Sequence, residues 1–216
     1  MVMSASPTDG HPAGTGRYLQ QSKIQAALGH AQDLGASYAE VRLMAITDSS
    51  VAIRDGKLER AIPGQEIGVT MRILADGAWG VHSTTDLQSL PGQVESTVRL
   101  AKAVAARRAS KDRPVALAEV PILENEVHWK PKKDVRNTDL DTKLHHLMTL
   151  HDSAAEDERI VSVTCGWHDE HLHTELMTSE GMNRVWSFQR SLINAPVTGR
   201  DGGDVVSYRT RHGGEG

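Results

Sequence analysis

The stretch that most constrains the fold runs from Gln65 to Thr85, where apolar and polar residues alternate. The apolar residues of its first half are Ile67, Val69, Met71 and Ile73. This alternation has the period of a half-buried β-strand. Asp76-Gly77 then supplies the two positive-φ positions of a tight turn, and alternation resumes after it. The sequence therefore predicts a β-hairpin here.

Further strands are expected before this hairpin, at residues 39–45, 51–53 and 58–62. Asp55-Gly56 provides a second tight turn, and Pro63-Gly64 is expected to end the third strand. Three successive turns connect strands directly, which makes the sheet mostly antiparallel. Later strands are predicted at residues 160–165, 171–177 and 185–189.

Helical spacing predicts three helices around this sheet. The first begins near Tyr18 and ends at Gly35, and the second follows Asp86 with Pro91 in its first turn. The third is capped by Thr138 or Asp139. We therefore predict an α+β fold, with a mostly antiparallel sheet covered by two or three helices.

The chain is expected to divide into three parts. Residues 1–16 are polar and rich in Gly, Pro, Ser and Thr, and we expect them to be disordered. Residues 17–198 form the α+β domain, with a possible hinge at 114–137, where prolines and charges cluster. Residues 199–216 are a glycine-rich tail that is not expected to be ordered alone.

Composition limits the function. Of the 216 residues, 38% are hydrophobic but only 4% aromatic, so the core must be aliphatic. A net charge of -4 gives no general reason to expect nucleic acid or an acidic membrane as a partner. No apolar run can span a bilayer, and no signal peptide is recognisable. The single cysteine, Cys165, fits a reducing cytoplasm.

The segment from Gly68 to Leu87 resembles a segment of the TldD/PmbA family of zinc metallopeptidases. It reads Gly-Val-Thr-Met-Arg-Ile-Leu-Ala-Asp-Gly-Ala-Trp-Gly-Val-His-Ser-Thr-Thr-Asp-Leu. Residues 35–42 and 55–59 are similar to the first strands of that family, and residues 179–181 and 200–204 to later landmarks. The Asp-Gly-Ala-Trp-Gly run at 76–80 favours the TldD branch over the PmbA branch. The motifs agree in order from about Ala26 to the C-terminus.

The resemblance implies proteolysis of extended or unfolded peptides by a zinc enzyme, working as a homodimer or as a heterodimer with a noncatalytic PmbA-like subunit. The family's catalytic helix carries His-Glu-x-x-x-His, and this sequence contains no His-Glu dipeptide. We therefore expect an N-terminal portion of a longer protein, with a catalytic domain after residue 216. Zinc would bind outside this chain. The chain itself would supply substrate-cleft and dimer contacts, and it would be inactive alone. The alternative is a noncatalytic PmbA-like partner, or a peptide-binding or assembly module.

No catalytic, cofactor-binding or metal residue is assigned within this chain, although one set of side chains raises the question. On an extended strand, Asp169, His171, His173 and Glu175 share one face and could hold zinc or nickel. The favoured reading is a polar outward face of the sheet, because structural zinc sites usually draw ligands from separate elements. Tight metal binding through His171 and His173 remains a third hypothesis.

Other candidates have simpler explanations. Cys165 near His168 suggests a thiol nucleophile, but Cys165 alternates with Val161 and Val163, which favours a buried structural cysteine. Three helical histidines lack the four-residue separation of a helical zinc pair: His145, His146 and His151.

The basic residues from Lys102 to Arg136 could bind a phosphate backbone. A solvated helix end and loop is the favoured reading, because no glycine-rich phosphate loop accompanies them. An open strand edge that accepts a peptide as an added strand is the remaining functional candidate.

Overall fold

The computed structural model describes residues 17–108, 113 and 115–215. The predicted disordered segment 1–16 lies outside the described residues. The helices and strands are, in chain order, α1 (Gln21–Asp33), β1 (Tyr38–Arg54), β2 (Lys57–Ala75), β3 (Ala78–Thr84), α2 (Val94–Arg107), β4 (Glu124–His128), α3 (Leu140–Ala154), β5 (Ile160–Thr178), β6 (Asn183–Asp201) and β7 (Asp204–Gly214). Short 3-10 helices precede α2 at Leu90–Gln93 and α3 at Val135–Asn137. None of these helices is long and apolar enough to cross a membrane.

The seven strands form one sheet in the order β3-β2-β1-β5-β6-β4, and β7 also pairs with β6. Every pairing is antiparallel except that of β4 with β6. Three helices accompany this sheet, so the predicted α+β fold is confirmed.

Both predicted tight turns are present. Asp55 and Gly56 have φ values of 47° and 72°, and Asp76 and Gly77 have values of 51° and 73°. Two consecutive positive φ angles give the turn whose twist suits a two-residue hairpin. The sequence therefore predicts the β1–β2 and β2–β3 connections correctly.

The predicted strand ends are wrong in the middle of the sheet. Strands expected at 39–45 and 51–53 are both part of β1, and β2 continues through Pro63-Gly64. β3 pairs only with residues 69–75 of β2, so Pro63 lies where β2 is an edge strand. Proline is tolerated there because its missing N–H can face away from the ladder. The strands predicted at 160–165 and 171–177 likewise merge into β5.

Two segments predicted as irregular contain strands. The glycine-rich tail forms the end of β6 and all of β7, with Gly202 at φ 57° in the turn between them. Within the predicted hinge, Glu124–His128 is β4, which pairs with β6. Neither strand is buried apart from partial cover of His128, so neither shows the apolar alternation by which a strand is recognised.

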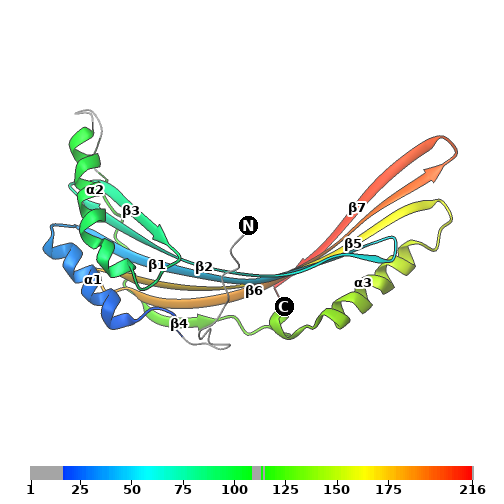
Figure 1. Ribbon diagram of the computed structural model, residues 1–216, viewed down its shortest axis with the longest axis horizontal. Coiled ribbons are helices and arrows are strands. Elements are labelled where there is room, and N and C mark those ends of the chain that lie inside the picture. Colours follow the sequence, from blue (N-terminus) through cyan, green and yellow to red (C-terminus); the bar gives the residue numbers. More distant parts are fainter. Residues whose placement is uncertain (1–16, 109–112, 114, 216) are drawn as a thin grey trace, which may run out of the picture.

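The core consists of two apolar clusters on one face of the sheet, which we call the helix face. Near one end, α1 and α2 pack on buried residues of β1 and β2 such as Leu43 and Met71. Near the other end, Leu147 of α3 packs on Val51 and Cys165. Figure 1 shows a long curved sheet with α1 and α3 on its convex side. The odd-numbered residues of β1, β5 and β6 face this side, since directly paired residues share a face.

We call the opposite, concave side the open face. None of the helices formed by the described residues covers it (Figure 1). Ile46, Leu172 and Phe188 form a row across β1, β5 and β6 on this side, and all three are half-buried. Met44 and Leu192 are 42% and 39% exposed. An apolar strip on the concave side of a sheet is typical of a surface that another protein unit covers.

Gly80 on β3 sets how closely α2 approaches the sheet. A Cβ at this position would clash with the carbonyl oxygen of Thr97 and lie 3.0 Å from the backbone nitrogen of Ala101. We expect Gly80→Ala to lower the free energy of unfolding by about 1–3 kcal/mol, because neither backbone atom can rotate away. Urea unfolding measures the change. Gly68→Ala is the matched control, since no atom lies within 4 Å of its added Cβ; equal losses in both variants would contradict this account.

Candidate functional site

A band of polar side chains crosses the helix face between the two apolar clusters. Its members come from β1, β5 and β6, and direct strand pairing places them side by side. They are Thr47, Ser49, Asp169, His171, His173, Glu175, Ser187, Gln189 and Ser191. The four predicted candidate ligands on β5 therefore do share one face. The expectation that this face is exposed is wrong, since Asp169, His173 and Glu175 are 3%, 6% and 0% exposed.

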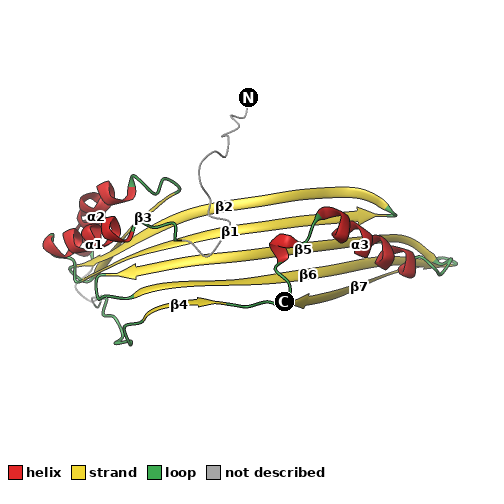
Figure 2. Cartoon of the chain, turned by 90° about the horizontal axis from the view of Figure 1, so that it is seen from below, coloured by secondary structure: helices red, strands yellow, loops and turns green. Residues whose placement is uncertain are grey.

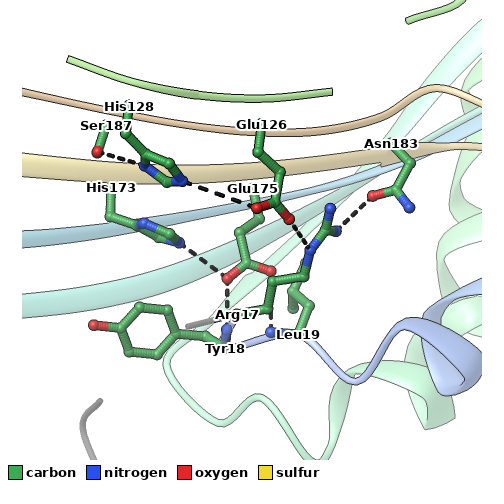
Figure 3. A network of polar contacts seen from close by, with 9 residues as sticks. All are labelled: Arg17, Tyr18, Leu19, Glu126, His128, His173, Glu175, Asn183 and Ser187. Atoms are coloured by element: carbon green, nitrogen blue, oxygen red, sulfur yellow. Dashed lines mark hydrogen bonds and ion pairs between the residues drawn. The ribbon is translucent and has the colours of Figure 1, made fainter. Parts of the chain in front are cut away.

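Glu175 anchors the start of the described chain to the sheet (Figure 3). Its Oε1 accepts a hydrogen bond from the backbone N–H of Tyr18 at 2.5 Å, and its Oε2 accepts one from Leu19 at 3.1 Å. Nε2 of His173 lies 3.1 Å from Oε1. The Tyr18 and His173 rings meet edge to face, with centroids 5.2 Å apart. This carboxylate therefore holds the entry to α1.

Arg17 extends this network to β4 and β6. Its Nε donates to Glu126 at 3.0 Å and its Nη1 to Asn183 at 2.6 Å. On β4, Nδ1 of His128 lies 2.9 Å from the hydroxyl of Ser187. Figure 3 marks this contact with a dashed line. These contacts cannot be predicted from local sequence patterns, because Arg17 and Asn183 are 166 positions apart.

Asp169 anchors α3 in the same way. One carboxylate oxygen, Oδ2, lies 2.7 Å from Nζ of Lys143. The other, Oδ1, accepts from the indole N–H of Trp167 at 2.7 Å and from the hydroxyl of Ser191. Both members of the ion pair are almost fully buried, with side chains 5% and 4% exposed. Lys143 also donates to Ser49 of β1 at 2.6 Å, so α3 is fastened to two strands.

His171 lies between these two anchors and is partly exposed. Burial, together with the nearby positive charge of Arg136, lowers the pKa of His171. Arg136 itself is held by Asp134 through hydrogen bonds that lower the pKa of that carboxyl group. The imidazole therefore favours its neutral form in the folded chain.

These residues do not fit a zinc ion. The oxygens of Glu175 and Asp169 already accept hydrogen bonds or face a lysine, and zinc would have to displace those partners. Among residues 17–108, 113 and 115–215, no group of three His, Cys, Asp or Glu side chains is placed to hold a metal ion. The strand that carries these four side chains, β5, thus anchors both α1 and α3 to the sheet.

A cavity of about 360 Å³ opens beside the polar band, where α3 begins. The Lys143–Asp169 pair and Ser49 line it on the polar side. The apolar lining consists of Val51, Ala61, Ile62, Pro63, Val135 and Leu140. Thr47, Asp48, Arg136 and Thr138 complete the polar lining. A space of this size, with apolar side chains and a set of polar groups in its wall, can hold a small ligand or a peptide side chain.

Cys165 is fully buried and faces α3, as predicted for a structural cysteine. Burial raises the pKa of its thiol, which disfavours the nucleophilic thiolate. We expect the native chain to react with a thiol reagent such as 5,5′-dithiobis(2-nitrobenzoate) at least about a hundredfold more slowly than the urea-unfolded chain, since opening of the core limits access. Fast labelling of the folded chain would contradict this placement.

The helical histidines and the basic residues, also considered as candidates, contact neighbouring parts of the fold. The ring of His146 lies 5.9 Å from Trp167 and lines a second cavity, of about 490 Å³, together with His212 of β7. Lys102 and Arg108 donate to backbone carbonyls of residues 34, 76 and 77. These two basic groups therefore tie α2 to neighbouring turns.

Comparison with known proteins agrees with the motifs. A family model described as PmbA/TldA metallopeptidase domain 1 matches residues 39–107, which span β1 to α2. No curated protein matches the chain.

Three solved structures share the fold. A proposed modulator of DNA gyrase from Bacteroides thetaiotaomicron is 22% identical, with a TM-score of 0.72 over 90% of this chain and 45% of that protein. A proposed modulator of a DNA gyrase from Thermotoga maritima is 16% identical, with a TM-score of 0.67 over 90% and 43%. TldE from Thermococcus kodakarensis is 14% identical, with a TM-score of 0.66 and the same coverage. The chain thus spans less than half the length of these proteins, and it resembles the N-terminal part of TldD/PmbA family proteins, as its sequence motifs predict.

Proposed function

We propose that this chain is the N-terminal, noncatalytic portion of a zinc-dependent peptidase that acts on extended or unfolded peptides in the cytoplasm. The observation that carries the proposal is the metallopeptidase-family match over β1 to α2. The buried polar band supports it, because its carboxylates are committed to holding α1 and α3. The zinc ligands and the catalytic glutamate would then be supplied outside residues 17–108, 113 and 115–215.

The open face gives this portion a second role. We propose that the row Ile46–Leu172–Phe188 packs against another part of the assembly, either in a homodimer or with a PmbA-like subunit. Support comes from the concave shape and from the apolar character of this row (Figure 1).

Hydrolysis of unfolded casein tests the catalytic part of the proposal. With added zinc, the 216-residue chain alone is expected to give no cleavage above the buffer rate. Cleavage is expected when it is mixed with a full-length TldD-like subunit that carries His-Glu-x-x-x-His and is itself inactive without a partner. Zinc-dependent cleavage by the chain alone would contradict the proposal.

Leu172→Asp tests the role of the open face. Burying a carboxylate in an apolar contact is unfavourable. The dissociation constant of the assembly, measured by sedimentation velocity, should therefore rise by at least about tenfold. Val206→Asp on the exposed β7 is the matched control, since this valine is 67% exposed. Equal association of the two variants would argue against contacts through this row.

A noncatalytic PmbA-like partner is the alternative within the same family. It differs in lacking the zinc motif in the whole protein. The casein assay gives the same result for both readings, whereas a reading frame that continues past residue 216 separates them: a His-Glu-x-x-x-His motif identifies the peptidase, and its absence identifies the partner.

A further inference from the structure

The N-terminal half of β2 is an unpaired sheet edge beside a cavity. β1 pairs with β2 from Lys57 to Leu74, whereas β3 pairs only with Val69 to Ala75. Within the described part of the chain, residues 57–68 therefore pair on one side only, and Figure 2 shows this edge at the border of the sheet. Backbone donors and acceptors along such an edge are complementary to an extended chain.

Pro63 fixes which residues of this edge face outward. A proline within an edge strand places its nitrogen on the side away from the ladder. Backbone groups alternate in direction along a strand, so Ala61 and Gln65, two positions away on either side, face outward as well. Their N–H and C=O groups remain available to a strand that adds there. The proline limits the pairing to a short peptide, because it removes one donor from the middle of the edge.

The cavity of about 360 Å³ lies directly beside this edge, and Ala61, Ile62 and Pro63 form part of its lining. Across from them stand Val135 and Leu140, at the start of the α3 region. Side chains of an added strand alternate between the two faces of the sheet, so every second one would face the cavity. Its volume exceeds that of a leucine or phenylalanine side chain.

The two cations that line the cavity, Lys143 and Arg136, are already paired with carboxylates. Lys143 is paired with Asp169 at 2.7 Å, and Arg136 with Asp134 at 2.6 Å. No cation is therefore left over to attract an acidic side chain, and Asp48 in the lining adds a negative charge. The wall chemistry favours an apolar side chain and disfavours an acidic one.

We propose that the outer edge of β2 at residues 61–65 binds an extended peptide as an added antiparallel or parallel strand, with one apolar side chain in the adjoining cavity. This inference deepens the proposed function and rests on it only for the identity of the peptide as a substrate. Binding at this edge needs neither zinc nor hydrolysis.

Fluorescence anisotropy with the full 216-residue chain tests the site. The probes are two fluorescein-labelled octapeptides of alternating threonine and serine, one with a central leucine and one with a central alanine. The leucine probe is expected to bind about tenfold more tightly, because its larger apolar side chain is buried in the cavity. Equal affinities, or no binding of either probe, would overturn the proposal.

Two pairs of variants separate the edge from the cavity. Gln65→Pro removes an outward N–H and is expected to weaken both probes about fivefold, whereas Gln65→Ala keeps the N–H and leaves binding unchanged. Ala61→Phe fills the cavity mouth and is expected to abolish the preference for leucine. Glu66→Phe is its control, since this neighbouring side chain faces the open side.

Urea unfolding of each variant shows whether it folds. If a variant of one pair does not fold, the other pair of variants tests the proposal. Identical binding by Gln65→Pro and Gln65→Ala would overturn strand addition. A preference for leucine that persists in Ala61→Phe would overturn the assignment of the cavity. Peptide binding by this edge in an assembly that cleaves nothing would refute the proposed function and leave the binding site intact.

Discussion

Lys143→Met is expected to lower the free energy of unfolding by about 3–5 kcal/mol, because it leaves the carboxylate of Asp169 buried without its cation. The two side chains are only 5% and 4% exposed, so water cannot replace the lysine without opening the contact between α3 and β5. Ser49 loses its hydrogen bond from Lys143 as well. Urea unfolding followed by circular dichroism measures the loss.

Two further variants isolate the buried charge as the cause. Lys130→Met removes an exposed lysine and should change stability by no more than about 0.5 kcal/mol. Lys143→Met combined with Asp169→Asn removes both charges and should recover part of the loss, since a neutral amide is cheaper to bury than an unpaired carboxylate. If both lysine variants unfold at the same urea concentration, the ion pair does not anchor α3.

Glu175→Ala is expected to lower the free energy of unfolding by about 2–4 kcal/mol. The carboxylate accepts hydrogen bonds from two backbone N–H groups, and Glu175 is 0% exposed. The same change should free the chain ahead of α1. Trypsin cleavage after Arg17 is therefore expected to accelerate at least about tenfold in native buffer, where the rate reports local opening. Gel electrophoresis with mass spectrometry follows this cleavage.

Glu66→Ala is the matched control for this prediction. Glu66 is an exposed residue of β2, and its removal should change neither the stability nor the rate of cleavage after Arg17. An unchanged cleavage rate in Glu175→Ala would mean that the contacts of Tyr18 and Leu19 with Glu175 do not hold this segment.

The sequence predicts the local features of this fold well. Asp55-Gly56 and Asp76-Gly77 carry their turn signal in two adjacent residues, and the buried stripe of α1 follows from its spacing. The sequence does not predict the full length of β1. Residues 47–50 are polar where this strand crosses the polar band, so the apolar pattern is interrupted there. β4 and β7 were missed because their pairing with β6, rather than a buried face, defines them.

For the candidate site, the sequence predicts the shared face of Asp169, His171, His173 and Glu175 but not its burial. Alternation shows which side chains lie together, whereas burial depends on what packs over them. Here the covering groups are Lys143 and the segment at Tyr18, and the latter lies 157 positions from Glu175. The cavity beside β2 could not be anticipated, because its walls come from four separate parts of the chain.

The central claim is that the histidine and carboxylate side chains of β5 anchor helices and do not bind zinc. Metal analysis of the purified 216-residue chain tests this claim most directly. After dialysis against zinc and then zinc-free buffer, plasma mass spectrometry is expected to find less than about 0.1 zinc per chain, since a structural zinc site would retain its metal. One zinc per chain that is lost in His171→Ala/His173→Ala would contradict the account and make β5 a metal site.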